Sequence, residues 1–89
     1  MNQELSELIT KIVNIKIQGQ IYFYKDKIQL YIKTEPEKIK EIENILKEKE
    51  YKNCITIKEE GMVTKIYKKG EKIISLIEKE KNTEINIYY

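Results

Sequence analysis

The spacing of hydrophobic residues near the start of the chain changes once, and each spacing predicts a different element. Over residues 3 to 12 the apolar side chains lie one helical turn apart, which predicts a short amphipathic helix with Glu4 in its first turn. The residues of this stripe are Leu5, Leu8, Ile9 and Ile12. From Val13 to Gln18 apolar and polar residues alternate, so we expect a half-buried strand that ends at a turn on Gly19.

The next two segments also alternate, and they predict a β-hairpin. A two-residue loop at Lys25-Asp26 sets Phe23 opposite Ile28 and Ile21 opposite Leu30. This register keeps the apolar side chains on one face, whereas a slip of one residue moves all of them to the other face. Lys25-Asp26 is not the favoured Asn-Gly type of turn, so a longer loop of the same parity is an alternative.

A second helix is predicted from Thr34 to about residue 50. Thr34 and Glu37 have the spacing of a capping box, and Pro36 lies in the first turn, where its missing N–H costs little. The apolar residues that follow at helical spacing form the expected buried stripe. They are Ile39, Ile42, Ile45 and Leu46.

The second half of the chain predicts further strands, separated by turns at Gly61 and at Lys69-Gly70. Residues 72 to 80 fit either a helix or a strand, because a short apolar run does not distinguish the two. Residues 14 to 19 and 56 to 61 read NIKIQG and TIKEEG. Their similarity suggests a duplicated α-β-β-β unit, although a chain so rich in isoleucine, lysine and glutamate also produces such matches by chance.

Together these elements predict a single α+β domain over residues 1 to 89. We expect an antiparallel sheet of about five to seven strands with two helices on one face. The expected order is α-β-β-β-α-β-β-β-β, with the last strand from Glu84 to Tyr89. If that strand lies at the sheet edge, its terminal tyrosines, Tyr88 and Tyr89, offer a route to a homodimer through the C-terminal strand.

Charge changes this picture little, because seventeen lysines oppose fifteen acidic residues and the two signs are interspersed. The absence of arginine argues against sequence-specific nucleic-acid recognition. A single cysteine, Cys54, and an N-terminal segment without a signal-peptide pattern favour the cytoplasm. No apolar run has the length of a membrane span, so we expect no membrane association. The shortage of residues with GC-rich codons fits an AT-rich genome, such as that of a low-GC bacterium or its phages.

Candidate catalytic residues are scarce, so we expect a protein that is not an enzyme. The chain contains no histidine, which excludes Ser-His and Cys-His mechanisms. Glu59 and Glu60 are adjacent and point to opposite faces of a strand, so we interpret them as a solvated turn rather than a catalytic carboxylate pair. Cys54 is expected to be a packed, inert thiol. With one aspartate, one cysteine and no phosphate-cradling glycine motif, we expect no metal and no cofactor.

Two groups of surface residues are candidates for binding. The first is the polar face of the predicted hairpin, where tyrosines stand among lysines, as in protein interfaces and on single-stranded nucleic-acid platforms. Its residues are Tyr22, Tyr24, Tyr31, Lys16, Lys27 and Lys33. The second is a lysine cluster at the Gly70 turn, which consists of Lys65, Lys68, Lys69 and Lys72. Tyrosine also favours strands and lysines are common at solvated hairpin tips, so a purely structural role is the alternative for both groups.

The leading hypothesis is a non-enzymatic protein that acts by occupying a surface of a larger host protein or ribonucleoprotein complex. Small size and AT-rich composition suggest, by analogy alone, an inhibitor of a host defence system from a phage or mobile element, such as an anti-CRISPR protein. One alternative is a nucleic-acid-binding module that uses the tyrosine-lined sheet face. Another is a structural homodimer or accessory subunit.

Overall fold

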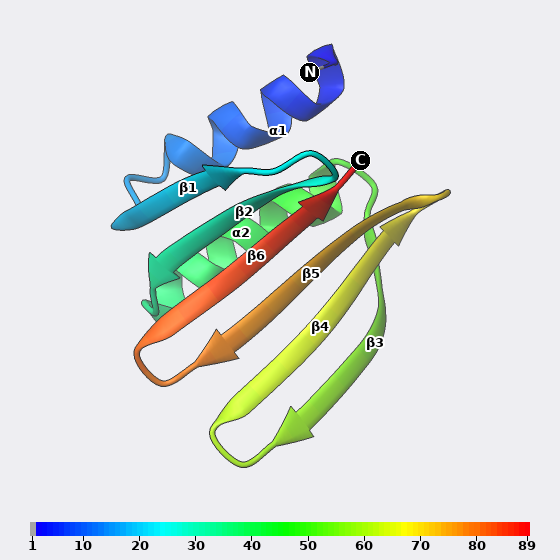
Figure 1. The fold of residues 1–89 in the computed structure, drawn as a ribbon. Helices are drawn as coiled ribbons and strands as arrows, with labels where there is room; N and C mark the ends of the chain where they lie inside the picture. The colour runs from blue at the N-terminus through cyan, green and yellow to red at the C-terminus, as the bar shows by residue number, and fades with distance from the viewer. Residues whose placement is uncertain (1) are drawn as a thin grey trace.

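The computed structural model describes residues 2–89 and contains two helices and a six-stranded antiparallel sheet (Figure 1). The strand order in the sheet is β1-β2-β6-β5-β4-β3. The elements are α1 (Gln3–Val13), β1 (Gly19–Phe23), β2 (Lys27–Lys33), α2 (Pro36–Glu48), β3 (Lys52–Glu59), β4 (Met62–Lys69), β5 (Lys72–Lys79) and β6 (Asn82–Tyr88). The prediction of an α+β fold with two helices and an antiparallel sheet is confirmed.

One face of the sheet packs against the helices, and the core lies there. In Figure 1 α2 lies behind the sheet and α1 lies next to β1. The central strands β2, β6 and β5 point buried side chains toward Leu8 and Ile12 of α1 and toward Leu46 of α2. The fully buried strand residues are Ile28, Leu30, Ile32, Ile74, Leu76, Ile85 and Ile87. Since side chains alternate along a strand, their sequence neighbours point to the opposite face, which we call the open face.

Helix α1 forms where its apolar stripe predicts it. The side chain of Asn2 caps it, because the Leu5 backbone N–H donates to Asn2 Oδ1 at 2.7 Å. The predicted strand from Val13 to Gln18 is wrong, because α1 continues to Val13 and a loop follows in which Lys16 has a left-handed backbone, with φ of 64°. The alternating isoleucines of this loop pack partly buried against the core without forming a strand.

The strand that follows the loop begins at Gly19, where the two strands of the hairpin lie very close. A side chain here would place its Cβ 2.2 Å from the Tyr31 carbonyl oxygen, so only glycine fits. The predicted register is confirmed: Phe23 pairs with Ile28 and Ile21 pairs with Leu30. The predicted two-residue loop is also confirmed, because the backbone N–H of Tyr24 donates to the Lys27 carbonyl at 2.9 Å.

Helix α2 begins with Pro36 at its first position, as predicted, but the predicted capping box is wrong. Glu35 is the N-cap residue and makes no side-chain capping bond. The Thr34 hydroxyl instead donates to the Lys79 carbonyl at 2.8 Å and lies 2.7 Å from Thr83 Oγ1, so it ties the start of α2 to the β5–β6 turn. The predicted stripe is buried, with Ile39, Ile42 and Leu46 in the core and Ile45 partly buried against it.

The second half of the chain is a four-stranded meander, so two strands and not three separate the helices. Residues 72 to 79 form a strand with apolar side chains on both faces, which explains why the sequence was ambiguous. The proposed duplication is wrong. Residues 14 to 18 lie in the loop before β1, whereas residues 56 to 59 belong to β3, so the two similar segments have different structures.

The C-terminal strand β6 lies in the middle of the sheet, between β2 and β5. Both of its edges are therefore paired, and the predicted homodimer through the C-terminal strand is wrong. The free edges of the sheet belong to β1 and β3. None of the helices within residues 2–89 has the length and apolar character needed to cross a bilayer.

Candidate functional site

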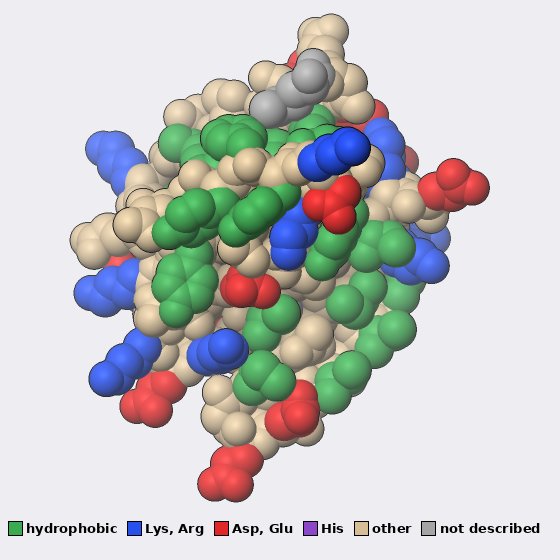
Figure 2. All heavy atoms as spheres, in the orientation of Figure 1, with side chains coloured by type: hydrophobic (Ala, Val, Ile, Leu, Met, Phe, Trp, Pro, Cys, Tyr) green, Lys and Arg blue, Asp and Glu red, His purple; other side chains and the backbone are tan. Residues whose placement is uncertain are grey.

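The open face of the sheet collects side chains from all six strands. One row across it consists of Tyr31, Glu84, Ile77, Thr64 and Ile57, as the strand registers show. Figure 2 shows this face, with hydrophobic side chains over β3, β4 and β5 and a second group over the β1–β2 hairpin. The open face therefore has an aliphatic half and a tyrosine half.

The aliphatic half lies on the three strands at the β3 end of the sheet. Ile55 and Ile57 of β3 are 50% and 48% exposed, and both point to the open face because they pair with Ile66 and Thr64 of β4. The other apolar side chains here are Met62, Ile66, Ile73 and Ile77. A contiguous, partly exposed apolar cluster on the surface of a folded domain commonly marks an interaction site.

The middle of the open face is polar, and its two central residues, Ser75 and Asn86, are buried. Asn86 is 2% exposed, accepts a hydrogen bond from Gln29 Nε2 at 3.0 Å and donates one to Ser75 Oγ at 3.0 Å. It also donates to Glu84 Oε2 at 3.0 Å. Because the buried Asn86 and Ser75 both have hydrogen-bond partners, these polar residues stabilise the centre of the sheet at little desolvation cost.

The tyrosine half lies over β1, β2 and the end of β6. Tyr22 and Tyr31 point to the open face and are exposed. Tyr24 lies between β1 and the two-residue loop of the hairpin, and the Lys27 ammonium lies 5.5 Å from its ring centre and 5.8 Å from that of Tyr88. Aromatic rings and a cation therefore meet at this end of the sheet.

Lysines divide unequally between the two sides of the protein. The strand registers place five lysines and two glutamates on the open face: Lys27, Lys33, Lys52, Lys68, Lys79, Glu59 and Glu84. Within residues 2–89, none of these five lysines forms an ion pair. Each of the six ion pairs instead joins another lysine to a glutamate of α1, of α2 or of the residue before α2. The open face is thus the side with uncompensated positive charge.

The structure brings half of the predicted binding residues onto the strands of this face. The residues on the strands of the open face are Tyr22, Tyr31, Lys27, Lys33 and Lys68. Four other candidates lie elsewhere: Lys16, and the lysine-cluster residues Lys65, Lys69 and Lys72, which pair with glutamates of the helices. Lys16 is in the loop before β1, and its carbonyl accepts a hydrogen bond from Lys38 Nζ at 2.6 Å. Lys69 points to the helix side, where Glu4 binds it at 2.9 Å. The role of all these residues in binding stays a prediction.

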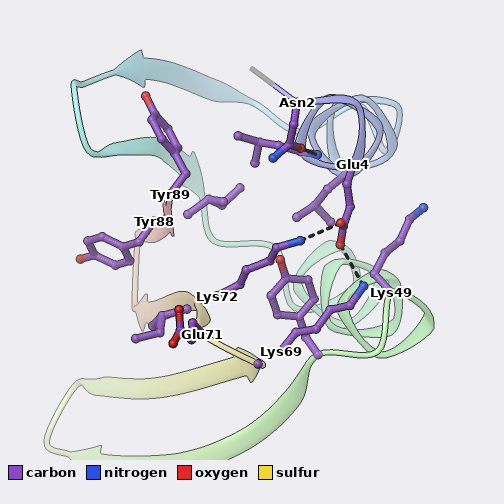
Figure 3. Close-up of a pocket in the computed structure, with 14 residues that line it drawn as sticks. Asn2, Glu4, Lys49, Lys69, Glu71, Lys72, Tyr88 and Tyr89 are labelled. Carbon is purple, nitrogen blue, oxygen red and sulfur yellow. Dashed lines mark hydrogen bonds and ion pairs between the residues drawn. The ribbon is translucent and has the colours of Figure 1, made fainter.

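A hollow of about 700 Å³ lies on the helix side, between the start of α1, the β4–β5 turn and the end of β6. Figure 3 shows Lys69 and Lys72 pointing toward Glu4, which they contact at 2.9 and 2.6 Å. Hydrogen bonds from Lys72 and then Lys69 lower the pKa of Glu4 to about 2. The Lys69 ammonium also lies 5.8 Å from the ring centre of Tyr51, and burial raises the pKa of this tyrosine. Because Glu4 satisfies both lysines, this hollow has little spare positive charge for an anionic ligand.

Cys54 does not have the environment predicted for it. It lies at a β-bulge in the edge strand β3 and is exposed, so the prediction of a packed thiol is wrong. Its Sγ lies 3.5 Å from the Lys52 carbonyl oxygen. Residues 2–89 contain no cluster of three or more ligating side chains that could hold a metal ion.

Sequence reasoning missed the aliphatic half of the open face. Ile55 and Ile57 alternate with polar residues, and this signal predicts a strand with one apolar face. The same signal does not reveal whether a helix covers that face. Comparison of the chain with protein-family models, with curated proteins and with solved structures gives no match.

Proposed function

We propose that this protein is a non-enzymatic binding protein that docks its open face onto a larger protein and acts by occupying that surface. The observation that carries the proposal is the exposure of Ile55 and Ile57, about half of each side chain, beside four further apolar residues that no helix covers. Burying such a cluster against a partner releases water from apolar surface, which is the main driving force of protein association.

Charge supports a partner of a particular kind. Lysines that form no ion pair within residues 2–89 border the isoleucines: Lys68 and Lys52 lie at one end of the aliphatic half, and Lys79 lies at the other, in the same row as Glu59. An apolar centre within a polar rim is the usual anatomy of a protein interface. We therefore propose that the partner has an apolar surface bordered by aspartate and glutamate side chains.

Occupation of a surface is sufficient to inhibit a larger protein, and it requires no catalytic group. We propose that the partner is a component of a host defence system in the cytoplasm and that the protein is an inhibitor of the anti-CRISPR kind. Small size and AT-rich composition support this narrower version. The docking surface itself does not depend on it.

The proposal is tested by co-purification of the tagged protein from its native host, with retained proteins quantified by mass spectrometry. Ile57→Lys places a charge in the aliphatic centre and should reduce a specifically retained partner at least about tenfold, because charging a central interface residue costs roughly 2 kcal/mol or more. Val13→Lys is the matched control, since Val13 lies on α1 and is 42% exposed. Equal retention by both variants, each with a wild-type melting temperature, contradicts the proposal.

A second candidate function is binding of single-stranded nucleic acid. The observation that favours it is the position of the Lys27 ammonium over the rings of Tyr24 and Tyr88, next to the exposed Tyr22 and Tyr31. Bases stack on such rings while lysines contact phosphates. This function predicts that an oligonucleotide quenches tyrosine fluorescence, with an affinity that falls steeply as salt rises. Tyr31→Ala should then weaken binding while Ile57→Lys leaves it unchanged.

A further inference from the structure

The edge strand β3 has a free side along its whole length. All eight residues from Lys52 to Glu59 are exposed. In an antiparallel pair only every second residue turns its N–H and C=O toward the neighbouring strand. Half of the backbone groups of β3 therefore bond to β4, and the other half point to the free edge, where another strand can pair with them. The opposite edge strand, β1, has only five residues.

The charges along β3 favour one kind of added strand. Lys52 lies at its start, Glu59 lies at its end, and Glu60 follows in the turn. A second copy of β3 laid antiparallel sets the lysine end of each strand against the glutamate end of the other. A parallel copy sets like charges side by side, which is destabilising. The strand is thus complementary to itself in the antiparallel direction.

We propose that β3 pairs antiparallel with β3 of a second copy of the chain, about a two-fold axis at Thr56. This register sets Ile55 opposite Ile57 of the second copy, on the same face, and it brings the Lys52 end of each strand to the Glu59 and Glu60 end of the other. An axis at Ile55 sets each Ile57 opposite the bulged segment of the other strand, and an axis at Ile57 brings Ile55 opposite Glu59. The axis at Thr56 is therefore the one that joins the isoleucines and pairs opposite charges. The bulge between Asn53 and Ile55 lies outside the three central residues of this register.

Such a dimer extends the sheet, and it places both open faces on the same side because opposite residues of paired strands point the same way. The open face itself is a poor surface for a second copy, since its five lysines and two glutamates repel their own kind. The edge pairing goes beyond the proposed function. In the dimer the two docking faces form one continuous surface, which suits a large partner or one that presents the same binding site twice.

Disulfide trapping tests the register. In Cys54→Ser/Thr56→Cys, the new cysteines lie directly opposite across the axis, with Cα atoms about 4.5 to 5.5 Å apart, within the range of a disulfide. In the control Cys54→Ser/Lys58→Cys they lie about 13 Å apart along the strands. We expect rapid covalent dimer from the first variant under mild oxidation and very little from the control. No dimer from either variant, or equal rates from both, overturns the proposal.

Light scattering measures the mass of the reduced protein, and it tests whether opposite charges at the two ends of β3 hold the dimer together. The wild-type chain should have the mass of a dimer at about 100 μM, Lys52→Glu should shift it to monomer, and Lys52→Glu/Glu60→Lys should restore the dimer. A wild-type chain that stays monomeric overturns the proposal, as does a double variant that behaves like the single one. The disulfide readout is independent of the docking test, because Thr56 points to the helix side, opposite Lys65. Lys52 lies on the docking face, so its variants are scored on the mass of the free protein alone. Loss of the dimer with partner binding intact would refute the edge pairing alone.

Discussion

The side-chain amide of Asn86 donates a 3.0 Å hydrogen bond to the hydroxyl of Ser75, across the β5–β6 pair in the centre of the open face. Both residues are buried although no helix covers them. The pair separates the tyrosines of β1 and β2 from the isoleucines of β3 and β4. These hydrogen-bonded polar residues therefore separate the tyrosine half of the open face from its aliphatic half.

Removal of this amide should destabilise the fold. Asn86→Ala leaves Gln29 and Ser75 without their shared partner, and we expect a loss of about 1 to 3 kcal/mol in the free energy of unfolding. Urea denaturation followed by circular dichroism measures it. Asn82→Ala is the control, since Asn82 lies on the same face of the same strand. Equal effects of the two substitutions would show that the hydrogen bonds of Asn86 contribute nothing to the stability of the fold.

The ion pairs of Glu4 predict a defined pH dependence. Lys72 and Lys69 hold the pKa of this carboxyl at about 2, below its ordinary value of 4.5. Because the folded-state pKa is lowered, the stability it contributes is present above about pH 4.5 and is lost as the pH falls toward 2. The melting temperature of the wild type should therefore exceed that of Glu4→Gln at pH 7, and the difference should vanish near pH 2.

The control for this titration is Glu41→Gln, because Glu41 forms no ion pair within residues 2–89. Its effect on the melting temperature should be small at pH 7. A Glu4→Gln difference that persists unchanged to pH 2 would mean that the two lysines do not stabilise this carboxylate.

The end of α2 offers a stabilising substitution. Glu50 follows the C-cap residue Lys49 with a left-handed φ of 69°, and the Tyr51 N–H donates to the Leu46 carbonyl at 2.9 Å. This is a Schellman motif, in which glycine is the preferred residue at the left-handed position. We expect Glu50→Gly to stabilise the protein by about 1 kcal/mol, which raises the melting temperature by about 4 to 8 °C.

Lys49→Gly is the matched control for that substitution, because Lys49 has a negative φ of −82° and gains nothing from glycine. Calorimetry should give a higher melting temperature for Glu50→Gly and a lower one for Lys49→Gly. If both variants melt below the wild type, the left-handed position carries no strain.

The local pattern of hydrophobic and polar residues was sufficient to predict some helices and strands and not others. The β1–β2 register followed from alternation alone, because Phe23 and Ile28 share a face in only one parity. The same reasoning failed before Gly19, since Ile15 and Ile17 pack against the core equally well from an irregular loop. The capping box failed for a related reason: the Thr34 hydroxyl bonds to the distant Lys79, which no local pattern contains.

The candidate site was predictable only in part. Tyr22 and Tyr31 were assigned to one face from the hairpin register, and they lie there. The exposed isoleucines depend on the strand order, because β6 takes a central position and β3 lies at an edge, with Ile55 and Ile57 on the face without helices. That order results from pairing between residues more than fifty positions apart, such as Ile28 with Ile87, which alternation does not encode.

The central claim is that the open face contacts a protein partner, and lysine footprinting of the complex tests it most directly. The purified complex and the free protein are acetylated in parallel, and each lysine is quantified by mass spectrometry. We predict that Lys52, Lys68 and Lys79 lose most of their reactivity in the complex, while Lys40 and Lys47 of α2 react as in the free protein. Protection of the α2 lysines with the open-face lysines still reactive would contradict the account.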